Sequence, residues 1–417
     1  MHITILADSI DTQYAGIHHY TKNLIENLLK IDDKNTYTII HPKPNKWLTS
    51  IINTASLNDR KSILPQNPES IPTTSPELSP RISEIIIPRS KFPGGETIRR
   101  FFKIPKIINK ISPDIVIEPC HIGPFRLKKG IRKILIVHDI TPILFPHFHT
   151  FRGRFIHKLF LKKSLKNADI IITPSQTTKD DILKKYQPKA KISVIHLGVN
   201  PIDRPIPSSK LTQLEEAIFQ DDNTFLQNFP NLKPYLLYLG TIEPRKNLET
   251  LVDAFIELKT TNEIPHKLVL AGQIGWKSKT LLKKIAKYNK TQTPPHSPQI
   301  ITTNHVTESK KNILLQNADI FIYPSLYEGF GLPPLEAMNA GIPVICSKGG
   351  SLKGIYKNTA LLFNPNDKET LKKHILSLIK NTNKNSRRNT LIKNGLSFAK
   401  THTWQKTAKE TLKTILY

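Results

Sequence analysis

Short apolar runs alternate with helical stretches through the C-terminal half of the chain, and this alternation constrains the fold more than any other feature. The stretches expected to be strands are residues 235–240, 267–272, 299–303, 319–324, 343–347 and 360–363. Apolar strands that alternate with helices are typical of a parallel sheet covered by helices on both faces. The pattern therefore predicts an α/β fold with a doubly wound parallel sheet in this half.

The N-terminal half shows the same alternation less regularly. Its expected strands are residues 2–7, 36–41, 114–118, 133–139, 169–175 and 191–197, and its expected helices are residues 15–31, 151–167 and 177–186. Residues 43–89 are polar and rich in Pro, Ser, Thr and Asn, which favours long loops around short elements. A second parallel-sheet domain is the simplest interpretation of this half.

The chain of 417 residues is longer than one hydrophobic core usually serves, so two domains are expected. The expected parts are an N-terminal domain over residues 1–200, a connection over 201–233, a C-terminal domain over 234–400 and a final helix over 401–417. In a doubly wound sheet the ligand lies beyond the carboxyl ends of the strands. Two such domains face to face would place the site in the cleft between them.

The chain is strongly basic, with 61 Lys and Arg against 33 Asp and Glu and a formal net charge of +28. Nucleic acid, an anionic membrane surface and anionic small substrates all suit such a charge. The lysines are scattered among many asparagines, as a compositionally biased genome would also produce, so these interpretations stay open. Nucleic acid is the least favoured, because no basic helix and no aromatic-and-glycine RNA motif stands out.

Two further features bear on where the protein works. The chain has no run of about 20 apolar residues, so no membrane-spanning helix is expected, and its N-terminus lacks the features of a secretory signal. Cys120 and Cys346 are far apart and no Cys-x-x-Cys occurs, which argues against a disulfide framework and a zinc site. The expected location is the cytoplasm, and the charge allows a peripheral position on the inner face of the plasma membrane.

Residues 323–347, YPSLYEGFGLPPLEAMNAGIPVICS, place Glu328 and Glu336 eight positions apart around a Gly-Phe-Gly turn. A strand ends before the turn, Pro333 is tolerated at the start of the following helix, and Gly341 suits a left-handed helix end. The backbone N–H groups of such a loop favour an anion, while the two carboxylates suit hydroxyl groups such as those of a sugar and a ribose. The alternative is a solvated loop before a capped helix, with Glu336 complementing the helix dipole.

This stretch closely resembles the Glu-x7-Glu signature of the retaining glycosyltransferases of family 4. A second stretch, YLLYLGTIEPRKNLETLVDAF at residues 235–255, is similar to the first strand and donor-diphosphate turn of the same family. The resemblance implies the GT-B fold, in which two Rossmann-like domains face each other across a cleft and the last helix crosses back onto the N-terminal domain. It also implies a nucleotide-sugar donor as substrate and no cofactor.

The resemblance assigns roles in the C-terminal domain. Arg245 and Lys246 would grip the donor diphosphate. Glu328 would hold hydroxyls of the donor sugar, and Glu336 would hold the ribose. A departing diphosphate needs positive charge, which an arginine fork and a lysine supply. Because the chain contains no Asp-x-Asp pair, these cations are expected to act without a metal ion; a basic pair on a solvated turn is the alternative. The other expected donor-binding positions in this domain are Gly240, Gly329, Phe330, Gly331 and Leu332.

In the N-terminal domain the resemblance points to two places. His138 and Asp139, in VHDITPILFPHF, are similar to the family's His-Asp element, whose histidine faces the donor sugar; a structural histidine at a strand end is the alternative. Gly16, in AGIHHY, is similar to a glycine loop near the donor phosphate. His18 and His19 stand where the family more often has a second glycine and an arginine, which puts a cationic contact in doubt at that point.

Together these features predict a metal-independent, retaining transfer of a hexose from a nucleotide-diphosphate sugar to a glycan or lipid-linked acceptor in lipopolysaccharide or polysaccharide biosynthesis. The motifs look most like those of mannosyltransferases that use GDP-mannose, and catalysis would rest on positioning and electrostatics. One alternative is a non-catalytic nucleotide-sugar-binding subunit, motivated by His18 and by Lys353-Gly354, where relatives usually carry Pro-Glu. Nucleic-acid binding is a third hypothesis. The residues predicted to be catalytic are His138, Arg245, Lys246 and Glu328.

Overall fold

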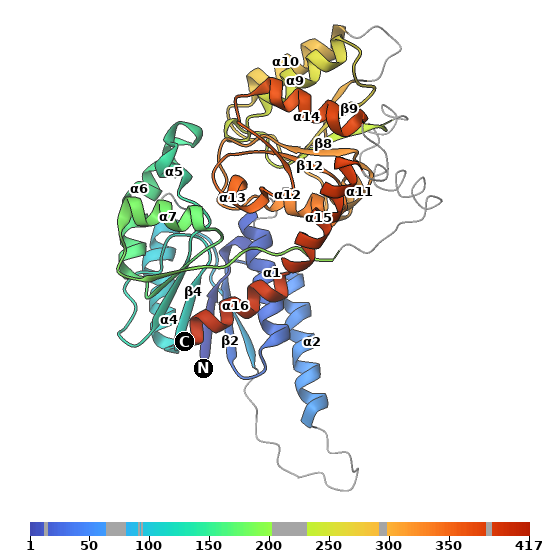
Figure 1. Cartoon of the computed structure of the whole chain (residues 1–417). Coiled ribbons are helices and arrows are strands. Elements are labelled where there is room, and N and C mark those ends of the chain that lie inside the picture. Colours follow the sequence, from blue (N-terminus) through green and yellow to red (C-terminus); the bar gives the residue numbers. More distant parts are fainter. Residues whose placement is uncertain are drawn as a thin grey trace. The chain divides into compact units, whose positions relative to one another are not determined.

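The computed structural model describes residues 1–11, 16–63, 81–90, 92, 95–201, 232–291, 298–380 and 386–417. Contacts divide the chain into two compact units. The N-terminal unit comprises Met1–Ile143, Phe151–His196 and Trp404–Tyr417, and the C-terminal unit comprises Leu144–Thr150 and Leu197–Thr403. Each unit is a twisted sheet with helices packed against it (Figure 1). Most of the expected connection, residues 202–231, lies outside the described residues.

The N-terminal unit contains a seven-stranded parallel sheet in the order β3-β2-β1-β4-β5-β6-β7. Its strands are β1 (His2–Leu6), β2 (Thr36–His41), β3 (Ile82–Ile86), β4 (Ile115–Glu118), β5 (Arg132–Ile136), β6 (Ile170–Thr173) and β7 (Lys191–Val194). The central strands β1 and β4 are apolar and almost wholly buried, as expected when helices cover both faces.

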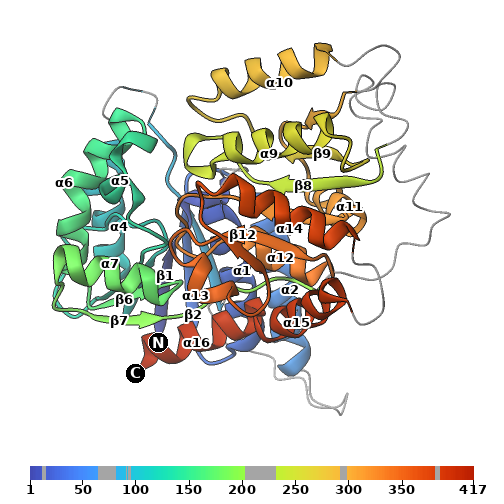
Figure 2. The same ribbon diagram turned by 45° about the horizontal axis from the view of Figure 1, so that its top comes forward.

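Helices connect these strands. They are α1 (Gly16–Ile31), α2 (Lys46–Ile63), α3 (Gly95–Ile98), α4 (Ile104–Ile111), α5 (Thr141–Leu144), α6 (Phe151–Asn167) and α7 (Gln176–Tyr186), with short turns η1 (Asp8–Asp11) and η2 (Arg99–Lys103). The last helix of the chain, α16 (Trp404–Leu416), also belongs to this unit and lies along α1 (Figures 1 and 2). Trp404 packs edge-on against Tyr20 of α1, with ring centroids 5.8 Å apart.

The C-terminal unit contains a six-stranded parallel sheet in the order β10-β9-β8-β11-β12-β13. Its strands are β8 (Tyr235–Leu239), β9 (Lys267–Ala271), β10 (Ile300–Thr302), β11 (Ile320–Tyr323), β12 (Val344–Ser347) and β13 (Leu361–Phe363). Its helices are α9 (Leu248–Thr260), α10 (Lys279–Thr291), α11 (Glu308–Asn317), α12 (Leu332–Asn339), α13 (Leu352–Tyr356), α14 (Lys368–Lys380) and α15 (Arg387–Thr401), with short turns η3 (Pro146–Phe148) and η4 (Pro244–Lys246).

The strand orders give each sheet one place where the chain changes direction across the sheet. In the N-terminal unit this switch point lies between β1 and β4, and in the C-terminal unit it lies between β8 and β11. Loops that follow the two strands of a switch point diverge and leave room for a ligand at the carboxyl edge of the sheet. The sequence prediction of two doubly wound parallel sheets is confirmed, and these two edges are where sites are expected.

One expectation about local structure is wrong. Residues 43–89 were expected to be mostly loop, but 18 of them form the helix α2. The high content of Ser, Thr and Asn masked a helical spacing of apolar residues, with Trp47 and Leu48 followed one turn later by Ile51 and Ile52. Leu48 is fully buried, so tertiary packing stabilises a helix whose composition alone does not favour it. Residues 64–80 lie outside the described part of the chain.

Among the described residues, no helix is both long and apolar enough to cross a bilayer.

Candidate active site

The loop after β8 begins with a close approach of two backbones. Gly240 and Gly272, which follow the adjacent strands β8 and β9, both have φ of +145°, a conformation that side chains other than glycine rarely adopt. A Cβ on Gly272 would lie 2.2 Å from the carbonyl oxygen of Gly240. Gly240, expected to bind donor, is therefore required by its backbone conformation, and Gly272 is required by the close packing of these loops.

The turn η4 presents the basic pair at the carboxyl edge of the sheet. Asn247 ends the turn in the left-handed region with φ of 54°, and its side-chain amide donates to the carbonyls of Pro324 (3.2 Å) and Pro365 (2.7 Å). The backbone N–H of Leu326 donates to the carbonyl of Arg245 at 2.8 Å. These bonds fix the basic turn to the loop that follows β11, across the switch point.

The two motifs predicted separately from the sequence meet in one ion-pair network. The carboxylate of Glu328 lies between two cations: Oε1 is 2.6 Å from Nζ of Lys246, and Oε2 is 2.9 Å from the guanidinium of Arg245. Lys246 also donates to the hydroxyl of Tyr323 at 2.8 Å, and Arg245 pairs with Glu243 at 2.9 Å. The structure thus brings together Arg245, Lys246 and Glu328, three of the four residues predicted to be catalytic.

Burial makes this network electrostatically strong. Glu328 and Lys246 are each 7% exposed. Burial alone would raise the pKa of Glu328, but the adjacent Arg245 and Lys246 outweigh it and hold that pKa below its ordinary value. Burial, and then repulsion from Arg245, lower the pKa of Lys246. The carboxylate is therefore ionised at neutral pH and fixed in place.

The Glu328 loop is held by close contacts to the turn after β12. The carbonyl of Glu328 accepts a bond from the N–H of Ser351 at 3.0 Å. Gly350 has φ of +59°, and a Cβ there would lie 2.5 Å from that same carbonyl. A Cβ on Gly349 would lie 2.4 Å from the carbonyl of Ser325. Both glycines are needed for this contact.

The Gly-Phe-Gly turn contributes backbone to the site and its aromatic ring to the core. Phe330 is 3% exposed and packs edge-on to Tyr356. Gly331 adopts φ of +87° immediately before α12, and its carbonyl accepts a bond from the hydroxyl of Tyr356 at 2.7 Å. The helix begins at Leu332, so the backbone amides of Gly329 through Leu332 lie at its N-terminus, where an anion is favoured.

Glu336 does not join the Arg245–Lys246–Glu328 network. On α12 it pairs with Nζ of Lys311 at 2.6 Å, and this lysine also pairs with Glu308 at 2.6 Å. Burial lowers the pKa of Lys311, but the two carboxylates outweigh burial and raise it. Lys311 was not predicted from the sequence, because nothing in its local pattern indicates that α11 places it against α12.

In the N-terminal unit, His138 lies just beyond β5 with a fixed tautomer. Its Nε2 is 3.0 Å from the carbonyl of Pro119, which only accepts, so Nε2 carries the proton and Nδ1 is an acceptor. Its backbone N–H donates to Nε2 of His121 at 3.1 Å, and Tyr20 of α1 packs on its ring. Burial lowers the pKa of His138 to about 4, so the imidazole is neutral at physiological pH. Gly16 is the exposed first residue of α1.

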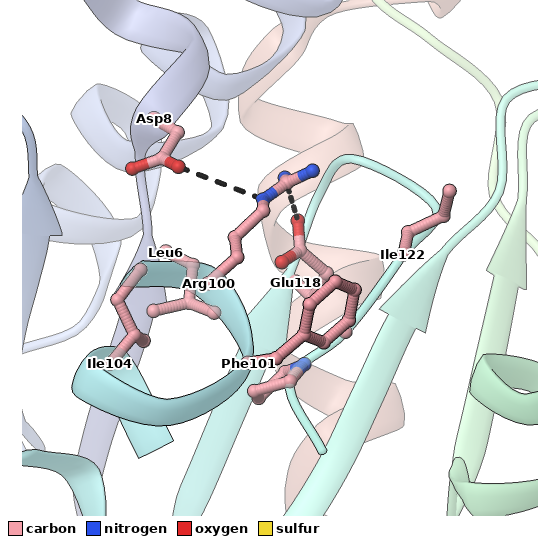
Figure 3. Close-up of a pocket in the computed structure, with 9 residues that line it drawn as sticks. Leu6, Asp8, Arg100, Phe101, Ile104, Glu118 and Ile122 are labelled. Atoms are coloured by element: carbon pink, nitrogen blue, oxygen red, sulfur yellow. Dashed lines mark ion pairs between the residues drawn. The ribbon is translucent and has the colours of Figure 1, made fainter. Parts of the chain in front are cut away.

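A charged cluster at the N-terminal switch point was missed from the sequence. Arg100 lies between two carboxylates, with its guanidinium 3.8 Å from Asp8 after β1 and 4.0 Å from Glu118 at the end of β4 (Figure 3). The neighbouring Arg99 is 1% exposed and pairs with Asp8 and Glu96. Asp8, Arg100 and Glu118 line a pocket of about 10 Å³, the size of one water. The sequence feature that could have indicated this cluster is Glu118, a charged residue at the end of the otherwise apolar strand IVIE.

The charged cluster of the N-terminal unit should make the free energy of unfolding depend on pH. The variant Glu118→Gln tests this. Burial raises the pKa of Glu118 to about 7 from an ordinary 4.5, although Arg100 opposes the shift. The folded state therefore binds a proton that the unfolded chain releases. The contribution of this proton to the free energy of unfolding is full below pH 4.5 and is lost as pH rises through 7. We expect Glu118→Gln to raise the free energy of unfolding at pH 8 by about 1–3 kcal/mol, with no gain at pH 4.5.

Urea unfolding at the two pH values measures the difference. The control is Glu26→Gln on α1, where the carboxylate pairs with Lys30 at the surface, and its effect should be equally small at both pH values. A Glu118→Gln protein that is destabilised at pH 8 would contradict a protonated Glu118 in the folded state.

Among the described residues, no group of three His, Cys, Asp or Glu side chains is arranged to hold a metal ion.

Comparison with known proteins finds family models that match both halves of the chain. The family model "Glycosyl transferases group 1" matches residues 219–397, and the model "Glycosyltransferase Family 4" matches residues 66–202. The O-antigen chain mannosyltransferase B of Escherichia coli is 31% identical over 291 residues, which are 69% of this chain and 70% of that protein. The O-antigen chain mannosyltransferase RfbU of Salmonella typhimurium is 27% identical over 237 residues, 57% of this chain and 58% of that protein.

Solved structures show the same fold at low sequence identity. Sucrose-phosphate synthase from Thermosynechococcus elongatus superposes with a TM-score of 0.67 at 19% identity, over 100% of this chain and 98% of that one. WaaG, a glycosyltransferase involved in lipopolysaccharide biosynthesis, superposes with a TM-score of 0.65 at 14% identity, over 99% of this chain and 98% of that one. With two parallel-sheet domains, both family models and a relative matched over most of its length, this chain belongs to glycosyltransferase family 4 and has the GT-B fold.

Proposed function

We propose that this glycosyltransferase moves mannose from GDP-mannose to a glycan or lipid-linked acceptor in O-antigen or related polysaccharide assembly, retaining the anomeric configuration and using no divalent metal. The observation that carries the proposal is the buried Arg245–Lys246–Glu328 network at the switch point of the C-terminal sheet. The mannose assignment is supported by the two relatives described as O-antigen chain mannosyltransferases. A nucleotide-sugar donor is supported by a neighbour of the same fold, Anabaena Alr3699/HepE, solved with UDP-glucose.

In this proposal the donor diphosphate binds at Arg245 and Lys246, and the amides at the start of α12 face its oxygens. The bond from the anomeric carbon to the phosphate oxygen breaks while the acceptor oxygen bonds to the same face of that carbon. The acceptor proton passes to the leaving phosphate oxygen. The fixed cations stabilise the charge that develops on the diphosphate, which is the type of contribution that preorganised groups make best.

His138 has a narrower role than general acid–base catalysis. Its pKa of about 4 keeps it neutral, and its Nδ1 is left as an acceptor when Nε2 donates to Pro119. We therefore assign it to accepting a hydrogen bond from a sugar hydroxyl. Because His138 stays neutral over this range, we expect it to cause no change in kcat/KM between about pH 6 and 8.

A donor screen tests the proposal directly. With an O-antigen-type acceptor oligosaccharide, we expect the protein to release GDP from GDP-mannose faster than it releases UDP from UDP-glucose or UDP-galactose, with no loss of rate in EDTA. Product NMR should show an α-mannosyl linkage, the configuration of the donor. A rate lost in EDTA and restored by manganese would contradict the metal-independent mechanism, and binding of GDP-mannose without turnover would indicate a non-catalytic subunit.

A further inference from the structure

The helix α6 has the largest excess of positive charge among the described helices of the N-terminal unit. Its sequence, FRGRFIHKLFLKKSLKN, contains six Lys and Arg and no Asp or Glu. It lies at the end of a basic region: residues 97–168 contain sixteen Lys and Arg against three Asp and Glu. The sequence expectation that no basic helix stands out is therefore wrong, and nearly half of the net charge of +28 lies in this region.

The buried face of α6 accounts for only part of its apolar residues. Leu161 and Leu165 are at most 1% exposed, and Phe160 stacks on Phe101 of η2 with ring centroids 4.6 Å apart. These residues attach the helix firmly to its unit. Figures 1 and 2 draw α6 on the outside of that unit, so its opposite face is open to solvent.

That outer face carries a second apolar row. Phe151 is 77% exposed, Phe155 56% and Leu159 54%, and their spacing of four residues places them on one side of the helix. Single exposed apolar residues are ordinary on protein surfaces, but three in a row on one helix face mark an interaction surface. The row is interleaved with exposed basic residues of the same helix, which are Arg154, Lys158, Lys162, Lys163 and Lys166.

We infer that this outer face of α6, termed here the α6 surface, docks the protein on an anionic membrane. A helix that presents Phe and Leu among Lys and Arg suits the boundary between lipid acyl chains and headgroups. The Lys and Arg stems reach toward anionic headgroups while the apolar row enters the acyl boundary. A nucleic acid would use the cations but has no use for exposed Leu159, so the apolar row favours lipid.

The inference extends the proposed function, because a lipid-linked acceptor is held at a membrane, but its test needs neither donor nor acceptor. The full-length protein is sedimented with vesicles of phosphatidylcholine alone and of phosphatidylcholine with phosphatidylglycerol. We expect binding to the anionic vesicles only, weakened by salt. Two variants of exposed residues test the two components: Phe151→Ser/Phe155→Ser/Leu159→Ser and Lys158→Glu/Lys162→Glu. Each should lower the partition coefficient by at least about tenfold.

The matched control is Lys283→Glu/Lys287→Glu on α10 of the C-terminal unit, which makes the same change in net charge at exposed positions. It should change binding by less than about twofold, and all variants should keep the wild-type melting temperature. Equal loss in the control would show that net charge alone drives binding and would overturn the α6 surface. So would wild-type protein that ignores anionic vesicles, or that binds a generic oligonucleotide more tightly than vesicles.

Discussion

Replacing Lys246 by methionine is expected to lower kcat/KM for the nucleotide-sugar donor by about a hundred- to a thousand-fold. Methionine keeps most of the side-chain volume but removes the ammonium group that lies 2.6 Å from Glu328. In the proposed mechanism this removes a positive charge that faces the departing diphosphate, at a position where burial strengthens electrostatic interactions. Steady-state kinetics with varied donor and saturating acceptor measure the effect.

The control for this variant is Lys283→Met, which removes an exposed lysine on α10 of the same unit and should leave kcat/KM within about twofold. Because Arg245 still pairs with Glu328 at 2.9 Å, the Lys246→Met protein should remain folded, as circular dichroism can verify. Wild-type turnover in a folded Lys246→Met protein would remove the lysine from the mechanism.

Gly350→Ala is expected to have the second-largest effect, through the backbone. The residue has φ of +59°, and the added methyl group would lie 2.5 Å from the carbonyl oxygen of Glu328 and 2.8 Å from its nitrogen. Relief requires the Glu328 loop to move, which displaces the carboxylate from Arg245 and Lys246. We expect the free energy of unfolding to fall by about 2–4 kcal/mol and donor turnover to fall at least about a hundredfold.

A glycine four positions later provides the matched control. Gly354 lies in α13, and a methyl group added there would have no other atom within 4 Å, so Gly354→Ala should raise the free energy of unfolding by about 0.5–1 kcal/mol. Urea unfolding of both variants gives the comparison. If the two substitutions had similar effects, the close contact between Gly350 and Glu328 would not be a constraint in solution.

The elements that the sequence predicted best are those whose pattern is local. The apolar strand of Tyr235–Leu239 and the turn that carries Arg245 follow one another along the chain, so periodicity and a short motif are enough to find them. The adjacency of β8 and β11 is different, because it depends on the order of strands in the sheet. Arg245 and Glu328 were therefore predicted as separate donor contacts, and their ion pair at 2.9 Å appeared only in the structure.

The charged cluster of the N-terminal unit could not be predicted from the sequence, because its residues are far apart along the chain. Asp8 and Glu118 are brought together by the parallel pairing of β1 with β4, more than a hundred residues apart, and Arg100 contacts both from η2. The glutamate in the strand IVIE is unusual, but no local pattern indicates which side chains it meets. The outer face of α6 was not predicted for a different reason, which is local to the helix. Apolar residues on both sides of the helix cancel in any simple reading of amphipathicity, so only the exposure of Phe151 and Phe155 separates the two faces.

The ion pairs of Glu328 neutralise the cations of the proposed donor site. Arg245 and Lys246 already pair with the carboxylate of Glu328. In the proposed mechanism, an incoming diphosphate therefore competes with Glu328 for these cations, and Glu328 then contacts the sugar. When the nucleotide product leaves, Glu328 pairs with both cations again, and neither is left buried and uncompensated. We therefore expect weak product inhibition, because Glu328 competes with the nucleotide product for Arg245 and Lys246.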